Sequence, residues 1–502
     1  MNGRRWLALL LAMALLLCAG CSFRTKYGDT FRFPLEGEPR QLDPQMATDT
    51  ASVTVLHALM EGLTSLGENG QPQPAVAESW QTADNVTWVF RLRDTTWSDG
   101  TPLTAADFVY AWKRAVDPAT GSPVGQRFDN IDSVVATDAH TLTVRLHTAE
   151  PDFAHAVADT PFFPCNEAFF LSTQGHYGMD AEYVLSNGAF TLASWQHHAY
   201  VSMRKNEAYH AATGVLPSAV RYVITAPDDP LVALEENNID ALELTTEQAV
   251  AAQKRGLPVI TMTDSLCAMW FNTSLPMLAD ATVRTALRDS VEWELLTEAL
   301  AVKGTAAGAV DFVPPDATAN GDGYREPAGT VGYIATTNAA ATLRAAELPA
   351  LEVLCADDED TLQVARLILQ SWQKHADLYF TLRPLSEAEL SARLAVGNYQ
   401  IAIGTVSGYS GDARTLLSAY VSDGAENVTR LHDRELTTLL AAANSLEGLV
   451  ACERRLHELC PCVPLWYAKR AYATGKDVEG VVIRPFGGNP YGAVYDFLNA
   501  EK

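Results

Sequence analysis

The tightest grouping of residues with metal or redox chemistry lies near the C-terminus. Cys460 and Cys462 flank Pro461, and His457 precedes them in a stretch, ACERRLHELC, whose pattern predicts a helix. Two thiols and an imidazole can hold a soft metal ion, but buried or spare thiols are the more common outcome. On one helix Cys452 and Cys460 would lie about 12 Å apart, whereas a disulfide needs Cα atoms within about 7 Å. We therefore assign no metal site, and the spacing of the cysteines dictates no disulfide.

Motifs for catalysis are missing from the sequence. It contains no G-x-S-x-G, no H-E-x-x-H, no phosphate-cradling G-x-x-x-x-G-K and no G-x-G-x-x-G after a predicted strand. Acids and histidines are scattered singly, and the pair Asp357-Asp358 is typical of a solvated turn. We predict a protein that is not an enzyme and needs no cofactor. A hydrolase that lacks a recognisable motif is the enzymatic alternative.

Length and charge limit the class of protein further. A chain of 502 residues exceeds a single hydrophobic core, because cores stop growing near roughly 250 to 300 residues. Two lobes or more are therefore expected. The formal net charge of -25 disfavours nucleic acid and anionic lipid head groups as partners. Attraction of cationic solutes is one interpretation of this charge, and simple solubility is the more ordinary one.

The N-terminus has the order of a secretory signal peptide. Arg4 and Arg5 precede an apolar run, 6–17, and small residues follow before Cys21. The run is too short for a transmembrane helix, which takes about 20 residues. The tetrapeptide at 18–21 resembles a bacterial lipobox, in which the last cysteine is acylated, although a cysteine stands where leucine is usual. We expect cleavage after residue 20 and lipidation of Cys21.

The stretch that the rest of the chain is organised around is 79–112. Apolar and polar residues alternate over 86–93, which predicts a strand with one buried face. Asp99-Gly100 predicts a tight turn, and Thr104 with Asp107 three residues later predicts a capped helix start. The apolar residues expected on the buried faces of the strand and the helix are Val86, Trp88, Phe90, Leu92, Phe108, Ala111 and Trp112.

Several motifs in this stretch and beyond it resemble one known family in its order. The family is the extracytoplasmic solute-binding proteins of oligopeptide, dipeptide and nickel ABC transporters, known as solute-binding protein family 5. The resemblance covers 31–498, nearly the whole chain after the leader. The motifs that carry it are Glu61-Gly62-Leu63, Ser79-Trp80, Trp97-Ser98-Asp99-Gly100-Thr101-Pro102, Ser186-Asn187-Gly188-Ala189-Phe190, Phe271-Asn272-Thr273, Val313-Pro314-Pro315 and Pro464-Leu465-Trp466-Tyr467.

This resemblance implies an α/β fold with two lobes, the type II periplasmic-binding-protein architecture, and an extra subdomain inserted in the first lobe. The strand-helix-strand order expected over 351–403 agrees with an α/β second lobe. The predicted boundaries are 1–20 for the signal peptide, 21–30 for a tether, 31–272 plus 468–502 for the first lobe with its insert at 71–186, and 273–467 for the second lobe.

The resemblance also implies where a ligand would bind. In the family the ligand lies between the lobes, and the peptide binders hold its amino terminus with an aspartate in a segment Asp-Tyr-x-Asp/Glu-Pro-x-x-Phe-Leu. Here Tyr409 takes the place of that aspartate, and Asp412 stands at the second acidic position, from which a loop shift could bring it to the amine. Trp270 is expected either on the cleft wall or packed at the hinge. Glu38 lies in a loop that the resemblance places at the lip of the cleft.

The predicted function is that of the lipid-anchored, extracytoplasmic substrate-binding protein of an ABC importer. It would capture peptides between its lobes and deliver them to permease subunits, while held at the cell membrane through Cys21. The same fold could bind a non-peptide solute, such as a sugar or a metal chelate, or serve as a surface receptor or chaperone without transport.

Overall fold

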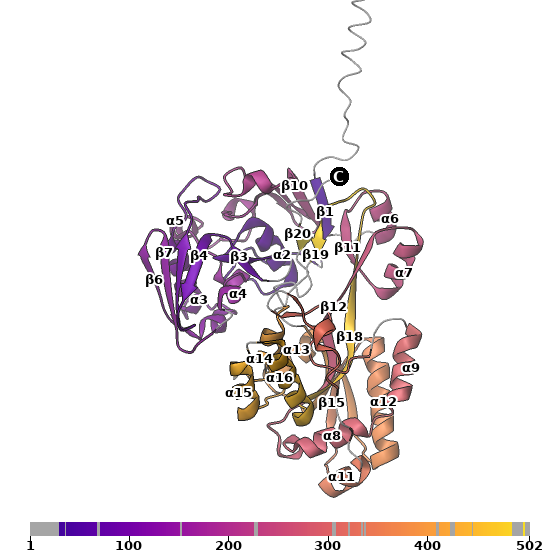
Figure 1. The fold of residues 1–502 in the computed structure, drawn as a ribbon. Coiled ribbons are helices and arrows are strands. Elements are labelled where there is room, and N and C mark those ends of the chain that lie inside the picture. The colour runs from indigo at the N-terminus through magenta and orange to yellow at the C-terminus, as the bar shows by residue number, and fades with distance from the viewer. Residues whose placement is uncertain are drawn as a thin grey trace, which may run out of the picture.

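A computed structural model divides the chain into an upper and a lower lobe (Figure 1). It describes residues 30–496 with the exception of 36, 68–70, 151–152, 225–228, 304–307, 320–321, 333–334, 336–337, 408–410, 422–426, 444 and 484–494. Two long strands, β12 (Val259–Phe271) and β18 (Cys462–Thr474), run from one lobe into the other. The first strand, β1 (Thr30–Pro34), and the last, β20 (Tyr495–Asp496), both lie in the upper lobe.

One sheet of the upper lobe has the strand order β1-β10-β9-β8. β1 pairs in parallel with β10, and the other neighbours are antiparallel. Phe31 and Phe33 of β1 and Val220 of β10 are buried on one face, where they share a hydrophobic cluster with α2. The elements of this part are α2 (Thr50–Leu59), β8 (Phe190–Gln196), β9 (Tyr200–Lys205), η4 (Ala212–Gly214), β10 (Ala219–Val223), α6 (Pro230–Glu235), β11 (Ala241–Leu244), α7 (Thr246–Lys254) and β19 (Val482–Ile483).

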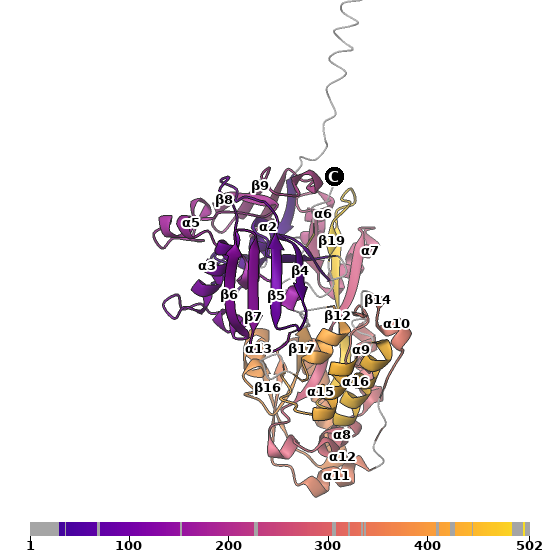
Figure 2. The same ribbon diagram turned by 60° about the vertical axis from the view of Figure 1, so that its left-hand side comes forward.

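A second four-stranded sheet of the upper lobe has the order β4-β5-β7-β6 and is antiparallel throughout. It has a hydrophobic cluster of its own, drawn from residues between Leu63 and Leu185. Figure 2 turns this sheet toward the viewer. Its elements are β2 (Thr64–Leu66), β3 (Pro72–Pro74), β4 (Ala77–Thr82), β5 (Thr87–Leu92), α3 (Ala105–Val116), η1 (Gly125–Phe128), β6 (Ile131–Asp138), β7 (Thr141–Leu146), α4 (Phe153–Ala156), η2 (Thr160–Phe162), α5 (Glu167–Ser172) and η3 (Ala181–Tyr183).

The elements predicted over 79–112 are confirmed. Most of the alternating residues form β5, whereas Val86, expected on the buried face, lies just before the strand and is only partly buried. Gly100 takes a φ of +85° in the turn, a conformation that suits glycine. α3 begins after Thr104, and the Asp107 carboxylate accepts the Thr104 backbone N–H at 2.7 Å. Val55, Leu56, Leu59 and Leu63 would share one face of a helix, and this spacing in the sequence predicts a helix over 51–64. The observed helix is shorter: α2 ends at Leu59, and 64–66 form β2.

The largest sheet has the order β11-β18-β12-β17-β15-β16. Successive residues of its central strands face opposite sides: Leu266 and Ala268 belong to one core cluster, and Cys267 and Met269 to the other. Helices α13 to α16 contribute to the first cluster and helices α8, α11 and α12 to the second. The elements of the lower lobe are η5 (Pro276–Leu278), α8 (Ala281–Asp289), α9 (Trp293–Lys303), β13 (Thr318–Ala319), β14 (Asp322–Gly323), α10 (Arg325–Ala328), α11 (Ala339–Ala346), β15 (Glu352–Ala356), α12 (Glu359–Ala376), β16 (Thr381–Leu385), α13 (Glu387–Ala395), β17 (Ile401–Ser407), α14 (Ala413–Ser418), α15 (Arg434–Ala442) and α16 (Leu446–Leu459).

The two lobes have separate cores. Within the described residues, the clusters of the upper lobe take in residues up to Val259 and again from Ala471, whereas those of the lower lobe run from Leu266 to Tyr467. Between them lies a small cluster around Met262 and Tyr472. The change of core thus falls in the middle of β12 and of β18. This mixed α/β architecture with two lobes and an extra sheet agrees with the predicted fold class.

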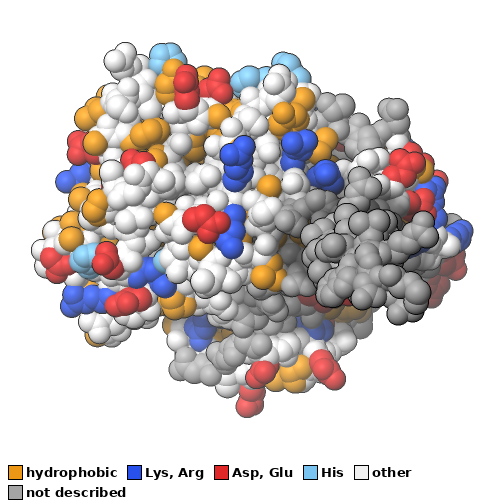
Figure 3. All heavy atoms as spheres, turned by 90° about the horizontal axis from the view of Figure 1, so that it is seen from above, with side chains coloured by type: hydrophobic (Ala, Val, Ile, Leu, Met, Phe, Trp, Pro, Cys, Tyr) orange, Lys and Arg blue, Asp and Glu red, His pale blue; other side chains and the backbone are white. Residues whose placement is uncertain are grey.

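Charge on the face seen from above is mixed. Among the side chains that the structure describes there, acidic and basic groups are interspersed, and histidines lie at its upper edge (Figure 3). The net charge of -25 is therefore not gathered into one acidic patch on the described part of this face. Only a patch of one sign would steer a charged ligand strongly.

Candidate ligand-binding region

A β-bulge interrupts the crossing strands where one core gives way to the other. The pairing between β12 and β18 shifts between Met262 and Ser265, so that Thr263 and Asp264 fall outside the ladder. A bulge frees backbone groups and bends the strand. The Asp264 carboxylate is almost fully buried and pairs with the guanidinium of Arg470 on β18, with Nε 3.1 Å from Oδ1. The Arg470 guanidinium also donates to the Tyr472 hydroxyl at 2.9 Å.

A loop of the lower lobe satisfies the backbone groups that the bulge frees. The Asp316 carboxylate accepts the Thr263 N–H at 2.5 Å, and the Asp316 N–H donates to the Thr263 carbonyl at 3.3 Å. Two residues later, the Thr318 N–H donates to the Gly411 carbonyl at 2.6 Å, and Thr318 forms a parallel bridge with Asp412. The loop therefore contacts both the crossing strand β12 and the segment at Gly411 and Asp412. The sequence predicts that this segment binds the amino terminus of the ligand.

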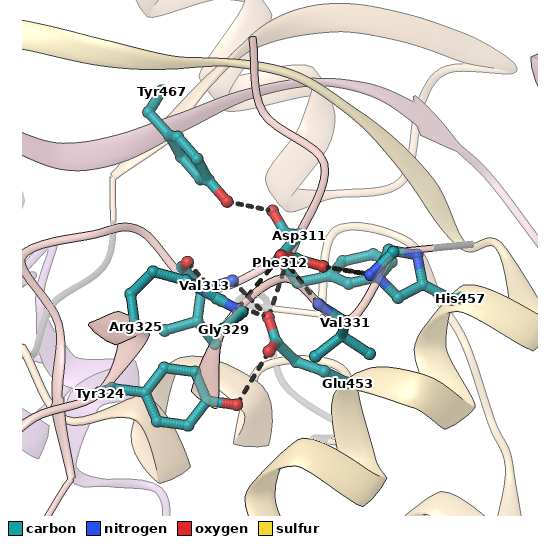
Figure 4. Close-up of polar contacts among 11 residues, drawn as sticks. Asp311, Phe312, Val313, Tyr324, Arg325, Gly329, Val331, Glu453, His457 and Tyr467 are labelled. Atoms are coloured by element: carbon teal, nitrogen blue, oxygen red, sulfur yellow. Dashed lines mark hydrogen bonds and ion pairs between the residues drawn. The ribbon is translucent and has the colours of Figure 1, made fainter. Parts of the chain in front are cut away.

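The same loop is anchored by the buried carboxylate of Glu453 on α16 (Figure 4). Glu453 has no exposed surface and accepts the backbone N–H groups of Phe312 and Val313 at 3.1 and 2.9 Å. The hydroxyl of Tyr324 and the guanidinium of Arg325 each donate to it at 2.8 Å. A buried carboxylate is stable only when it is paired and hydrogen-bonded in this way. These contacts hold Phe312, Val313, Tyr324 and Arg325 in place.

A second buried carboxylate, Asp311, lies beside the first. His457 Nε2 lies 3.1 Å from it, Arg325 donates at 3.2 Å and the Gly332 N–H at 2.9 Å. Burial alone would raise the pKa of the Asp311 carboxyl, but the bonds from His457 and Gly332 and the charge of Arg325 outweigh burial and hold its pKa below the ordinary value. The Tyr467 hydroxyl, on crossing strand β18, donates to the Asp311 carbonyl at 3.1 Å.

Of the two residues predicted to bind a ligand's amine, the structure describes one. Tyr409 lies outside the described residues. Asp412 is half-buried and is the N-cap of α14, where its Oδ1 accepts the Thr415 N–H at 3.1 Å. The negative charge of an N-cap carboxylate also interacts favourably with the positive end of the helix dipole. Asp412 therefore has a capping role, and the predicted role of both residues in binding remains a prediction.

Trp270 and Glu38 occupy different settings. Trp270 is only 3 % exposed, belongs to the core of the lower lobe and donates its indole N–H to the Gly404 carbonyl at 3.0 Å. Trp270 therefore packs within the lower lobe, and its predicted contact with a ligand stays a prediction. The Glu38 carboxylate accepts a hydrogen bond from His197 Nδ1 at 2.6 Å and another from the backbone N–H of His198 at 3.1 Å. Burial raises the pKa of Glu38, but the bonds and charges of the two histidines outweigh it, so the net shift is downward.

The cysteines that the structure describes form no disulfide. All six that the structure describes are buried and free, Cys460 and Cys462 among them. Burial raises the pKa of the Cys460 thiol to about 11, so the reactive thiolate is disfavoured. In the described ranges no group of three or more His, Cys, Asp or Glu side chains could hold a metal ion. Cys21 lies outside the described residues.

Sequence reasoning missed the buried network around Glu453. One signal was present: Glu453 and His457, four residues apart, fall on the helix face that carries Leu449, Cys452 and Leu456. A charged residue on an apolar face demands a buried partner. Nothing in the pattern names that partner, because Asp311 and Arg325, the first residue of α10, lie more than one hundred residues earlier in the chain.

Comparison with known proteins identifies the class. Residues 71–427 match the profile of the bacterial extracellular solute-binding proteins, family 5. The match covers more than half of the chain, and the chain belongs to this family. Within the part of the chain that the structure describes, no helix is long and apolar enough to cross a membrane.

Individual relatives are similar along most of their length. The chain is 27% identical to the probable deoxycholate-binding periplasmic protein YgiS of Escherichia coli, covering 92% of each chain. It is also 27% identical to the E. coli periplasmic murein peptide-binding protein MppA, over 86% of each. Listeria monocytogenes OppA, solved bound to peptide, superposes with a TM-score of 0.70 at 22% identity, covering 94% of this chain and 99% of that one. The last comparison supports the fold.

Proposed function

We propose that this protein captures peptides between its two lobes outside the cytoplasmic membrane and delivers them to an ABC permease. In this proposal a lipid on Cys21 holds the protein at the membrane. More than one acyl chain is needed for firm anchoring, because a single chain binds only marginally. The relatives whose names describe peptide or solute binding support the class of ligand.

The observation that carries the proposal is the interrupted pair of crossing strands. Two lobes with separate cores are joined through β12 and β18, and the bulge at Thr263 and Asp264 falls where the core changes. Rigid lobes joined by a short flexible region can close around a ligand, which is how hinge-type binding proteins bury it. A peptide could then be held largely by backbone hydrogen bonds, with little demand on its side chains.

The recognition of the ligand's amino terminus is the part that departs from the family. A buried ammonium group needs a partner of opposite charge. Tyr409 cannot supply that charge at neutral pH, so Asp412 is the candidate, in addition to its capping role. In the proposal Glu38 lies near the edge of the site, held by His197 and His198.

A non-peptide solute is the second candidate. It is favoured by the replacement of the family's amine-binding aspartate at Tyr409 and by the similarity to YgiS, whose name describes deoxycholate binding. A solute without an amine would not need Asp412. A surface receptor and a hydrolase are further alternatives, which the experiment below distinguishes.

The proposal is tested by uptake of isotope-labelled peptides into bacteria that carry or lack this protein. We expect uptake to fall when the gene is deleted and to return when the full chain is restored. Unchanged uptake with peptide binding retained would identify a receptor instead of an importer component. Release of cleaved products by the purified protein would identify a hydrolase.

A further inference from the structure

The hinge and the candidate ligand segment are joined by one short tripeptide, 316–318. At one end, Asp316 exchanges two hydrogen bonds with the backbone of Thr263, one from its carboxylate and one from its N–H. At the other end, Thr318 bonds to Gly411 through both its N–H and its hydroxyl, at 2.6 and 3.3 Å. Asp412, which follows Gly411, is the residue proposed for the ligand's amine.

The tripeptide has little freedom to flex between these two ends. Ala317, its central residue, has no exposed surface and belongs to the core of the lower lobe. Its carbonyl accepts the Tyr324 N–H at 2.8 Å, and its N–H donates to the Pro314 carbonyl at 3.2 Å. Tyr324 is itself bonded to the buried Glu453. Displacement of the segment at Gly411 is therefore passed to Asp316.

Thr263 is the place on β12 where such a displacement can act. Its backbone groups fall in the bulge and are not used by the ladder with β18. Backbone groups that the ladder leaves unpaired bond either to another protein group or to water. Asp316 supplies a protein partner from the lower lobe, although its own side chain is exposed. The angle between the lobes therefore depends on the side chain of Asp316, which is exposed and does not pack in a hydrophobic core.

We propose that Asp316 is a positioning residue that couples the hinge bulge at Thr263 to the ligand segment at Gly411 and Asp412. The ligand part of this inference rests on the proposed function, and the hinge part does not. Without the Asp316 carboxylate, the Thr263 N–H would bond to water. The ligand-free protein would then sample a wider range of angles between its lobes. Ligand binding is then weaker, because more conformational freedom is lost on closure.

The test compares Asp316→Ala with two matched variants. Asp316→Asn keeps an oxygen that can accept the Thr263 N–H, so it should behave like the parent. Asp322→Ala removes an exposed acid from β14 of the lower lobe, which controls for charge. Nitroxide labels on cysteines introduced at Val135, 52% exposed, and Val396, 74% exposed, report the distance between the lobes. The six thiols that the structure describes are buried and should not take up label. Cys18 and Cys21, which lie outside the described residues, are changed to serine in every labelled protein.

The distances are measured by pulsed electron paramagnetic resonance in the full-length protein without ligand. We expect Asp316→Ala to broaden the distance distribution, with Asp316→Asn and Asp322→Ala matching the parent. An unchanged distribution in Asp316→Ala would overturn the inference. This readout does not depend on the ligand, and a change of stability alone would not produce it.

Binding is measured separately by calorimetry with trialanine as the probe. We expect Asp316→Ala to raise the dissociation constant by about tenfold, which corresponds to ~1.4 kcal/mol. A parent protein that does not bind trialanine would count against peptide capture of this kind, and the distance measurement would still decide the role of Asp316. Equal affinity in the parent and Asp316→Ala would overturn the coupling.

Discussion

The Glu453 carboxylate and the Arg325 guanidinium lie 2.8 Å apart, in a place where Glu453 has no exposed surface. Two backbone N–H groups and the Tyr324 hydroxyl also bond to this carboxylate. One buried side chain therefore holds the loop that reaches both the crossing strand and the candidate ligand segment.

We expect Glu453→Ala to lower the free energy of unfolding by about 3 to 5 kcal/mol, because it breaks the buried ion pair with Arg325 and removes the acceptor of four donors, leaving Asp311 as the remaining carboxylate partner of Arg325. Urea unfolding followed by far-ultraviolet circular dichroism measures the change. Glu458→Ala, on the same helix with a side chain 58% exposed, should cost about 1 kcal/mol or less. Equal losses in the two variants would show that the network around Glu453 does not stabilise the fold.

The fold could be predicted from the sequence in some detail where local rules operate. The alternation around Trp88 and Phe90, the cap at Thr104 and the helix face of α16 depend on residues close in the chain. The end of α2 at Leu59 was missed, because apolar residues continue beyond it into an extended segment. The network around Glu453 was missed because its members meet only in three dimensions.

A second prediction concerns pH. The pKa of Asp311 is lower in the folded protein than its ordinary value of 3.8. The stabilisation it contributes is therefore complete above that ordinary value and is lost as the pH falls through the lower, folded-state pKa. We expect Asp311→Asn to be less stable than the wild type near neutral pH, and the difference to shrink as the pH falls below 3.8. Urea unfolding at a series of pH values checks this, and a difference that stays constant with pH would contradict an ionic role for Asp311.

A third prediction separates packing from ligand contact at Trp270. Trp270→Phe removes the hydrogen bond from the indole N–H to the Gly404 carbonyl and leaves that acceptor buried. We expect a loss of roughly 1 to 3 kcal/mol in stability with no change in the affinity for trialanine. Thermal unfolding and calorimetry measure the two quantities. Weaker binding with stability retained would instead put Trp270 in contact with the ligand.

The fourth prediction concerns the N-terminus. Cys21→Ala should leave the protein without lipid, since the lipobox-like stretch ends at this residue. Mass spectrometry of the membrane fraction is expected to find acylated wild-type protein and no acylated variant. Detection of an acylated Cys21→Ala variant would exclude lipidation at this site.

The candidate site was less accessible to sequence reasoning than the fold. The replacement of the amine-binding aspartate by Tyr409 is visible in the sequence, but its consequence depends on how the segment is held. Asp412 proves to be a helix cap, and the loop beside it is fixed by Thr318 and Asp316. The family resemblance alone does not reveal these contacts, because they join segments that are far apart in the chain.

The most direct measurement of the central claim is the identity of the molecule that the protein carries. The full chain would be produced in bacteria, purified without refolding and denatured, and the small molecules released would be identified by mass spectrometry. Capture of peptides predicts a set of peptides of one or a few lengths with varied sequences. A single non-peptide solute, such as a sterol or a sugar, would contradict it.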